Sequence, residues 1–86
     1  MTEDEIRTAV IDTLLSVAPD IEGREIAPDE DLREQFDLDS MDFLNFVIAL
    51  HERLDVDIPE TDYARLATLG ACVGYLDARL VDRSLG

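Results

Sequence analysis

The residues best suited to chemistry lie in one short stretch, FDLDSMDFLNF, which runs from Phe36 to Phe46. Within it the hydroxyl of Ser40 lies between acidic residues, immediately before an apolar run. A serine nucleophile needs a neighbouring base, and the only histidine, His51, follows eleven residues later. On one continuous helix that separation is about 16 Å along the axis, far beyond hydrogen-bond reach. A Ser-His relay is excluded if this segment is a helix, and we expect no catalytic residue.

The acidic residues and the cysteine offer no better site. The chain has 21 Asp and Glu residues, so nearly any carboxylate pair arises by chance, and most belong to a solvated surface. Asp37 and Asp39 have the spacing of the first two EF-hand ligands, but Ile48 stands where that loop requires Glu. The single Cys72 cannot form an internal disulfide or a thiolate cluster. We therefore predict no metal site.

The composition predicts one small, acidic domain. The 86 residues can build one hydrophobic core, and an apolar content of 47% argues against disorder, so we assign residues 1–86 to a single domain. The formal net charge of −14 disfavours nucleic acid and anionic membrane surfaces, and it favours partner proteins with basic docking patches. There is no signal segment or long apolar stretch. We expect a cytoplasmic monomer without stable membrane insertion.

The first half of the chain predicts a capped helix followed by a long connection. Thr2 and Glu5 form a capping-box pattern, and apolar residues at helical spacing predict a helix from about residue 3 to Val17. From Ala18 to Asp39 the chain is interrupted by prolines and has the character of a loop. So long a loop is unusual in a small domain and needs anchors. The expected anchors are Ile21, Ile26, Leu32, Phe36 and Leu38.

The segment from Asp39 to Leu54 contains no Gly or Pro and predicts a second helix, which ends before Pro59. One broad apolar face is expected to comprise Phe43, Phe46, Val47, Leu50 and Leu54. A second apolar stripe, at spacing i, i+3 and i+7, comprises Met41, Leu44 and Ile48. In so small a domain the core can fully cover only one face. The stripe is therefore either a docking surface or covered by the loop and neighbouring helices, and the pattern favours neither.

Two further helices complete the prediction. A short one is expected from about Glu60 to Leu66, and Thr68 is expected to cap a last helix that runs to about Val81. The core face of this last helix should comprise Val73, Leu76 and Leu80, with Leu69 and Cys72 beside them. We interpret Gly70 and Gly74 as tolerated surface positions. The predicted fold is all-α, with four helices, a long loop between the first two and a short third helix.

The run DLREQFDLDSMDFLNFVIALHERLDVDIPE, with the later ATLGACVGYL, resembles an acyl carrier protein. In that family a D-S-L or D-S-M motif opens the second of four helices, as Asp39, Ser40 and Met41 do here. The length, the acidity, the long first loop, the Ile-Pro step after the second helix and the capped last helix also agree. The resemblance covers nearly the whole chain and implies a four-helix bundle of the acyl-carrier type.

The resemblance implies a chemical role for Ser40. A phosphopantetheinyl transferase would attach 4′-phosphopantetheine from coenzyme A covalently to its hydroxyl, with Asp39 as motif residue and helix cap. The transferase supplies the base and the magnesium, which explains why no base accompanies Ser40. The thiol of the arm then carries acyl intermediates as thioesters to acyl-loading and acyl-processing enzymes. The chain would be a carrier and not an enzyme.

The resemblance also assigns roles to the two faces of the second helix. It indicates that the stripe and its acidic neighbours are the partner-docking residues, namely Met41, Asp42, Leu44, Ile48 and Glu52. In family members the acyl chain can fold back between the helices. The corresponding acyl-cavity or core residues are Phe43, Phe46, Val47, Leu50, Leu54 and Leu76.

Departures from the family pattern indicate a specialised carrier. Asp37 stands where the family commonly has Gly, although Asp accepts a left-handed backbone better than most residues. Asn45, His51 and Arg53 stand in the second helix where acids often occur, while residues 1–34 hold eleven acids against three arginines. We therefore predict a specialised fatty-acid, lipid or polyketide pathway. The alternatives are a peptidyl or aminoacyl carrier of nonribosomal synthesis, or an unmodified acidic helical adaptor that binds through the stripe.

Overall fold

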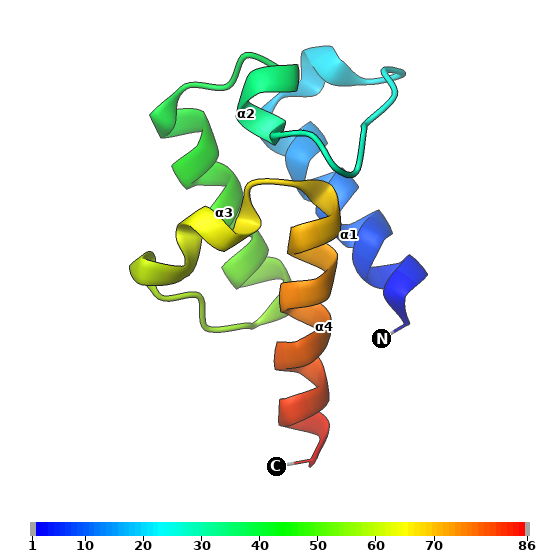
Figure 1. Cartoon of the computed structure of the whole chain (residues 1–86), viewed down its shortest axis with the longest axis vertical. Helices are drawn as coiled ribbons and strands as arrows, with labels where there is room; N and C mark the ends of the chain where they lie inside the picture. Colours follow the sequence, from blue (N-terminus) through cyan, green and yellow to red (C-terminus); the bar gives the residue numbers. More distant parts are fainter. Residues whose placement is uncertain (1, 86) are drawn as a thin grey trace.

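The computed structural model describes residues 2–85, with side chains up to residue 80, and it is helical throughout its regular segments (Figure 1). In chain order these segments are α1 (Glu3–Val17), the 3-10 helix η1 (Pro19–Ile21), α2 (Leu32–Gln35), α3 (Ser40–Leu54), the 3-10 helix η2 (Glu60–Leu66) and α4 (Leu69–Leu85). The all-α prediction is confirmed. The last helix, which the sequence predicts to end near Val81, continues to Leu85. No described helix is long and apolar enough to cross a membrane.

Helix α1 begins at the predicted capping box and packs against α3 and α4. The Thr2 hydroxyl accepts a hydrogen bond from the Glu5 backbone N–H at 3.2 Å, and the Glu5 carboxylate accepts one from the Thr2 N–H at 2.9 Å. This second bond lowers the pKa of the Glu5 carboxyl, because it stabilises the charged form. The buried face of α1 comprises Ile6, Val10, Thr13 and Leu14.

The connection from residue 18 to residue 39 is more regular than the sequence indicates. It contains η1 and α2, and the Asp31 carboxylate caps α2 by accepting the N–H groups of Arg33 at 2.8 Å and Glu34 at 3.2 Å. Four residues are too few for a periodic apolar pattern, so the sequence analysis missed α2. The predicted anchoring is confirmed. Ile26 is half-buried against the core, and the buried anchors are Ile21, Leu32, Phe36 and Leu38.

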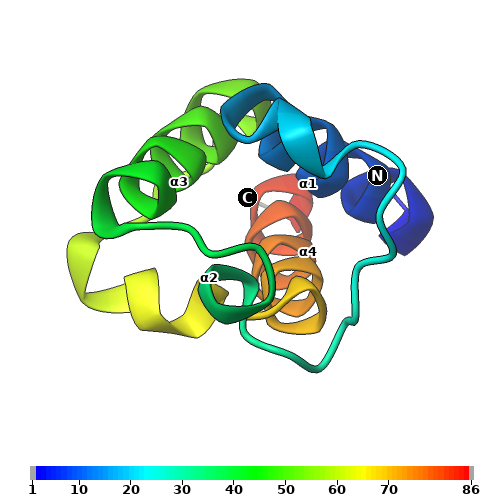
Figure 2. The same cartoon turned by 90° about the horizontal axis from the view of Figure 1, so that it is seen from above.

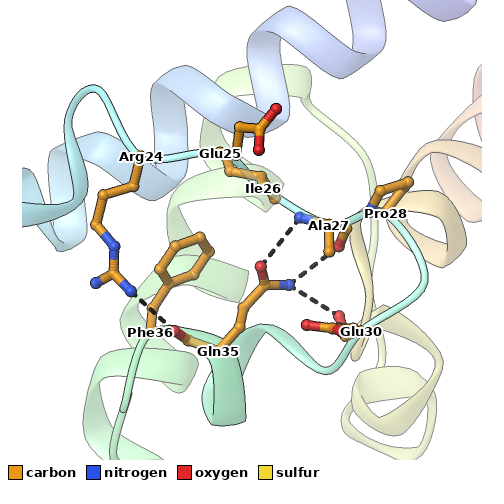
Figure 3. Close-up of a pocket in the computed structure, with 8 residues that line it drawn as sticks. All are labelled: Arg24, Glu25, Ile26, Ala27, Pro28, Glu30, Gln35 and Phe36. Atoms are coloured by element: carbon orange, nitrogen blue, oxygen red, sulfur yellow. Dashed lines mark hydrogen bonds between the residues drawn. The ribbon is translucent and has the colours of Figure 1, made fainter.

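The Gln35 side chain holds the outer part of this connection in place (Figure 3). Its amide oxygen accepts the Ala27 N–H at 3.1 Å, and its amide nitrogen donates to the carbonyls of Ala27 and Glu30 at 3.0 Å each. The guanidinium of Arg24 lies 5.1 Å from the centroid of the Phe36 ring. These residues border a hollow of about 590 Å³. The Gln35 side chain therefore pairs backbone groups that no helix or strand pairs in this part of the chain.

Backbone hydrogen bonds also tie the connection to the beginning of α4, beside which α2 lies in Figure 2. The Leu32 N–H donates to the Ala67 carbonyl at 2.7 Å, and the Gly70 N–H donates to the Pro28 carbonyl at 3.0 Å. Gly70 is exposed as predicted, but a Cβ atom on it would lie 3.2 Å from that carbonyl, so the prediction that a glycine is merely tolerated there is wrong. Here the small residue allows two backbones to approach closely.

The short η2 helix, at the residues where the sequence predicts a short helix, is fixed to α4. The Tyr75 hydroxyl donates to the Asp62 carboxylate at 2.7 Å, and Arg79 donates to the same carboxylate at 2.9 Å. Burial, together with this hydrogen bond, raises the pKa of Tyr75. The predicted core face of α4 is confirmed, with Leu80 half-buried and Leu69, Cys72, Val73 and Leu76 buried.

Candidate functional site

Ser40 is the first residue of α3, and its side chain is exposed. The predicted cap is present, because the Asp39 carboxylate accepts the Asp42 N–H at 2.8 Å. Just before it, Asp37 has a φ of 54°, the left-handed conformation that the sequence analysis anticipates at this position. This turn and the cap direct the chain from α2 into α3 and place the serine at the outer end of the helix.

The guanidinium of Arg33 contacts Ser40. Its Nη2 atom donates a hydrogen bond to the Ser40 Oγ at 3.1 Å, and its carbon atom lies 5.9 Å from the centroid of the Phe43 ring. The sequence analysis did not identify Arg33 as a site residue. The available signal was a basic residue seven positions before the serine, within an acidic connection. Their proximity depends on α2, which the sequence analysis missed.

The hydroxyl of Ser40 has no histidine base beside it. The Nδ1–H of His51 donates to the Val56 carbonyl at 2.7 Å, at the opposite end of α3. Among the residues that the structure describes, no group of three His, Cys, Asp or Glu is placed to hold a metal ion. His51 is therefore too far from Ser40 to activate its hydroxyl, and the Ser40 side chain is exposed at the start of α3.

The outward stripe of α3 is open to solvent. The exposed fractions of Met41, Leu44 and Ile48 are 63%, 37% and 43%, and these three are the exposed large apolar residues of the described chain. The alternative in which the loop or a neighbouring helix covers the stripe is therefore wrong. Of the acidic residues predicted beside it, Glu52 is exposed and Asp42 is half-buried.

The inward face of α3 contributes to the hydrophobic core. Phe43 and Leu54 are half-buried against this core, whereas the fully buried members of the predicted cavity set are Phe46, Val47, Leu50 and Leu76. Val47 also lines a hollow of about 220 Å³ between α3 and the segment that follows it. The structure thus brings the predicted residues together as core, and their role around an acyl chain stays a prediction.

Comparison with known proteins shows which family the chain belongs to. Residues 9–76, which include α2, α3 and Ser40, match the family model described as the phosphopantetheine attachment site. An acyl carrier protein of Campylobacter fetus subsp. fetus is 36% identical over 74 residues, which cover 86% of this chain and 90% of that protein. The chain belongs to the acyl carrier protein family.

Other relatives agree with this assignment. The acyl carrier protein of Lactobacillus johnsonii is 33% identical over 76 residues, covering 88% of this chain and 94% of its own length. The mitochondrial acyl carrier protein of Saccharomyces cerevisiae is 27% identical over 79 residues, which cover 88% of this chain and 63% of that protein. The predicted family is confirmed. The protein is a carrier rather than a catalyst, its cofactor is covalently bound 4′-phosphopantetheine, and acyl carrier proteins interact with phosphopantetheinyl transferases and acyl-processing enzymes.

Proposed function

We propose that Ser40 is the residue that carries 4′-phosphopantetheine. The observation that carries this proposal is its exposed hydroxyl at the start of α3, which a transferase can reach without moving the core. The surroundings fit the group, since Arg33 supplies a cation and a hydrogen-bond donor at the atom that would become the ester oxygen. Ser16, the other serine with a described side chain, donates its hydroxyl to the Thr13 carbonyl at 2.6 Å.

The attachment reaction is a phosphoryl transfer to the Ser40 hydroxyl. Ser40 Oγ attacks a phosphorus atom of the pyrophosphate in coenzyme A, a new O–P bond forms, and the bond to the departing adenosine bisphosphate breaks. The hydroxyl proton passes to a base of the transferase, because this chain places no histidine base next to Ser40. Such a transfer depends mainly on positioning and on electrostatic stabilisation. Once attached, the arm supplies a terminal thiol that carries acyl groups as thioesters.

We also propose that the outward stripe of α3 binds the partner enzymes. Three exposed apolar side chains, Met41, Leu44 and Ile48, lie on the helix that Ser40 opens, so a bound enzyme would have the serine next to its contact surface. Asp42 and Glu52 add negative charge for basic patches of the partner, and the net charge of −14 steers the encounter.

The remaining expectations concern the acyl group and its setting. We expect the acyl chain to enter the core near Phe46, Leu50 and Leu76, and residues 1–86 to act as one monomeric carrier domain in the cytoplasm. A specialised fatty-acid, lipid or polyketide pathway is supported by Asn45 and Arg53, which reduce the negative charge of α3. Partner enzymes of such a pathway would rely on the apolar stripe more than on the charge of α3.

Intact mass measurement after incubation with coenzyme A and a broad-specificity phosphopantetheinyl transferase tests the attachment. The wild-type chain should gain one phosphopantetheine group, Ser40→Ala should gain none, and the matched control Ser16→Ala should gain one. Circular dichroism verifies that both variants remain helical. Modification of Ser40→Ala, or failure of the wild-type chain with several transferases, would contradict the proposal. The second of these outcomes would favour the unmodified adaptor.

A further inference from the structure

The Arg33 guanidinium forms no ion pair with a carboxylate of the described residues. The described ion pairs of the chain involve Arg7, Arg65 and Arg79, and no described carboxylate oxygen lies within 4.0 Å of the Arg33 guanidinium. Its contacts are instead with two uncharged groups, the Ser40 hydroxyl and the Phe43 ring. Because an arginine side chain stays protonated at every physiological pH, a full charge remains available beside Ser40.

The backbone holds Arg33 in this position. Its N–H donates to the Asp31 carboxylate at 2.8 Å, and its carbonyl accepts the Leu38 N–H at 2.9 Å. The preceding residue, Leu32, is fully buried and donates its N–H to the Ala67 carbonyl. The arginine is therefore attached to a short helix that is itself anchored in the core, and its backbone need not move for the side chain to bind a ligand at Ser40.

We propose that Arg33 binds the phosphodiester through which the arm is joined to Ser40, an inference that rests on the proposed function. The guanidinium already donates to Oγ, and the non-bridging oxygens of the diester would be bonded to the same phosphorus as that atom. Arginine offers a planar set of donors that matches a phosphate group in a bidentate manner. Arg33 is thus a positioning residue for the base of the arm.

The charges around Ser40 explain why a cation is needed there. The phosphodiester brings a negative charge to a place where Asp37, Asp39 and Asp42 already lie close along the chain. Repulsion among these groups would push the arm away from the surface. Arg33 offsets that repulsion, and its contact with the Phe43 ring limits the directions in which the guanidinium can turn.

A purely structural role for Arg33 makes the opposite prediction. In that case the arginine would only join α2 to the start of α3 through the Ser40 hydroxyl, and esterification would weaken the link, because an ester oxygen accepts hydrogen bonds poorly. Arg33→Gln would then destabilise the unmodified protein at least as much as the modified one. If Arg33 binds the diester, the substitution destabilises the modified protein more.

A thermodynamic cycle separates the two roles. The melting temperatures of the unmodified and modified forms are measured for the wild-type chain, for Arg33→Gln and for Arg24→Gln. Arg24 is the matched control, since it also lies in the connection and over an aromatic ring, Phe36. The shift in melting temperature on modification should be less favourable in Arg33→Gln than in the wild-type chain, and unchanged in Arg24→Gln. Equal shifts in all three proteins would overturn the inference.

The phosphorus nucleus gives a readout that stability does not affect. In the modified proteins the ³¹P resonance of the diester should move in Arg33→Gln relative to wild type, and stay in place in Arg24→Gln. A resonance at the same position in all three would overturn the inference. Arg33→Lys keeps the charge without the planar donor set, so we expect its resonance between the other two. If transferases fail to modify Arg33→Gln, the cycle of melting temperatures is completed with Arg33→Lys. A change in melting temperature on modification that equals the wild-type change then overturns the inference.

Intact mass measured before these experiments separates failure of the attachment at Ser40 from failure of the role proposed for Arg33. If the wild-type chain is never modified, the proposed attachment at Ser40 is wrong and so is the inference about Arg33. A chain that is modified at Ser40, but whose cycle and ³¹P resonance do not depend on Arg33, leaves the carrier function intact and overturns the inference alone.

Discussion

The two faces of α3 carry similar apolar side chains and meet different surroundings. Phe46, Val47 and Leu50 on one face are almost completely buried, whereas Met41 on the other is 63% exposed. Full burial of such a side chain contributes about 1.5–3 kcal/mol to stability, so the inward face holds the fold together. The outward face contributes little to the stability of the protein without a partner. Helical spacing in the sequence identifies both apolar faces of α3. Only the packing of the other helices shows which of the two faces stays exposed.

The largest effect is expected from truncation of the inward face. Phe46→Ala removes a buried ring that packs against Phe43, with 6.2 Å between the ring centroids, and should lower the free energy of unfolding by about 3–5 kcal/mol. Met41→Ala on the outward face should change it by less than about 0.5 kcal/mol. Urea denaturation followed by circular dichroism measures both. Equal losses would contradict the assignment of Phe46 to the core and of Met41 to the exposed stripe.

Truncation of the outward face should affect partners instead of stability. Leu44→Ala is expected to lower kcat/KM for phosphopantetheinyl transfer about fivefold, because truncation of an interface anchor commonly costs about 1 kcal/mol of binding. The free energy of unfolding should stay within about 0.5 kcal/mol of wild type. Thr8→Ala, at an exposed position of α1, is the control and should leave the rate unchanged. A rate that Leu44→Ala leaves unchanged would remove the stripe from the docking surface for this enzyme.

The comparison also explains how much could be predicted from the sequence. Helices α1 and α3 were predicted to within a residue, because each combines a polar cap with an apolar period longer than three turns. The short α2 has no such period, so the sequence analysis treated its residues as loop. The contact of Arg33 with Ser40 depends on α2 and on the left-handed turn at Asp37 together, so no local pattern could indicate it. The close approach of the Pro28 carbonyl to Gly70 could not be predicted either, because the two residues are distant in the chain.

A smaller effect is expected from charge on the outward side of α3. Glu52→Arg should slow phosphopantetheinyl transfer a few-fold at low salt, and the difference should shrink as salt screens the charges. Asp12→Arg makes the same change of net charge on the exposed surface of α1 and serves as control. Rate measurements at two ionic strengths distinguish the variants. Equal slowing by both would show that net charge matters and that the position on α3 does not.

The smallest signal expected is the thiol reactivity of Cys72, whose side chain is buried. Its thiol donates to the Leu66 carbonyl at 3.3 Å, and burial raises its pKa from 9.0 to about 12. The unmodified folded protein should therefore show almost no reaction with a thiol reagent at pH 8, whereas the protein unfolded in urea should react fully. Rapid reaction of the folded chain would contradict this burial.

The same shift predicts a dependence of stability on pH. Because the folded state raises the pKa of Cys72, the protonated thiol contributes stability that is fully present below pH 9 and is lost as the pH rises toward 12. Tyr75, whose pKa is also raised, contributes with the same sign above pH 10. Urea midpoints measured from pH 8 to pH 11 should fall for wild type, and fall less for Cys72→Ala. Parallel curves would remove Cys72 from this explanation.

The most direct test of the carrier assignment is to locate the modification within the wild-type chain. Trypsin cleaves after Arg33 and Arg53, and the peptide of residues 34–53 contains Ser40 as its only hydroxyl side chain and has no cysteine. After treatment with coenzyme A and a transferase, mass spectrometry of the digest should find phosphopantetheine on this peptide alone. Phosphopantetheine on any other peptide, or on none, would contradict the assignment of Ser40 as the attachment residue.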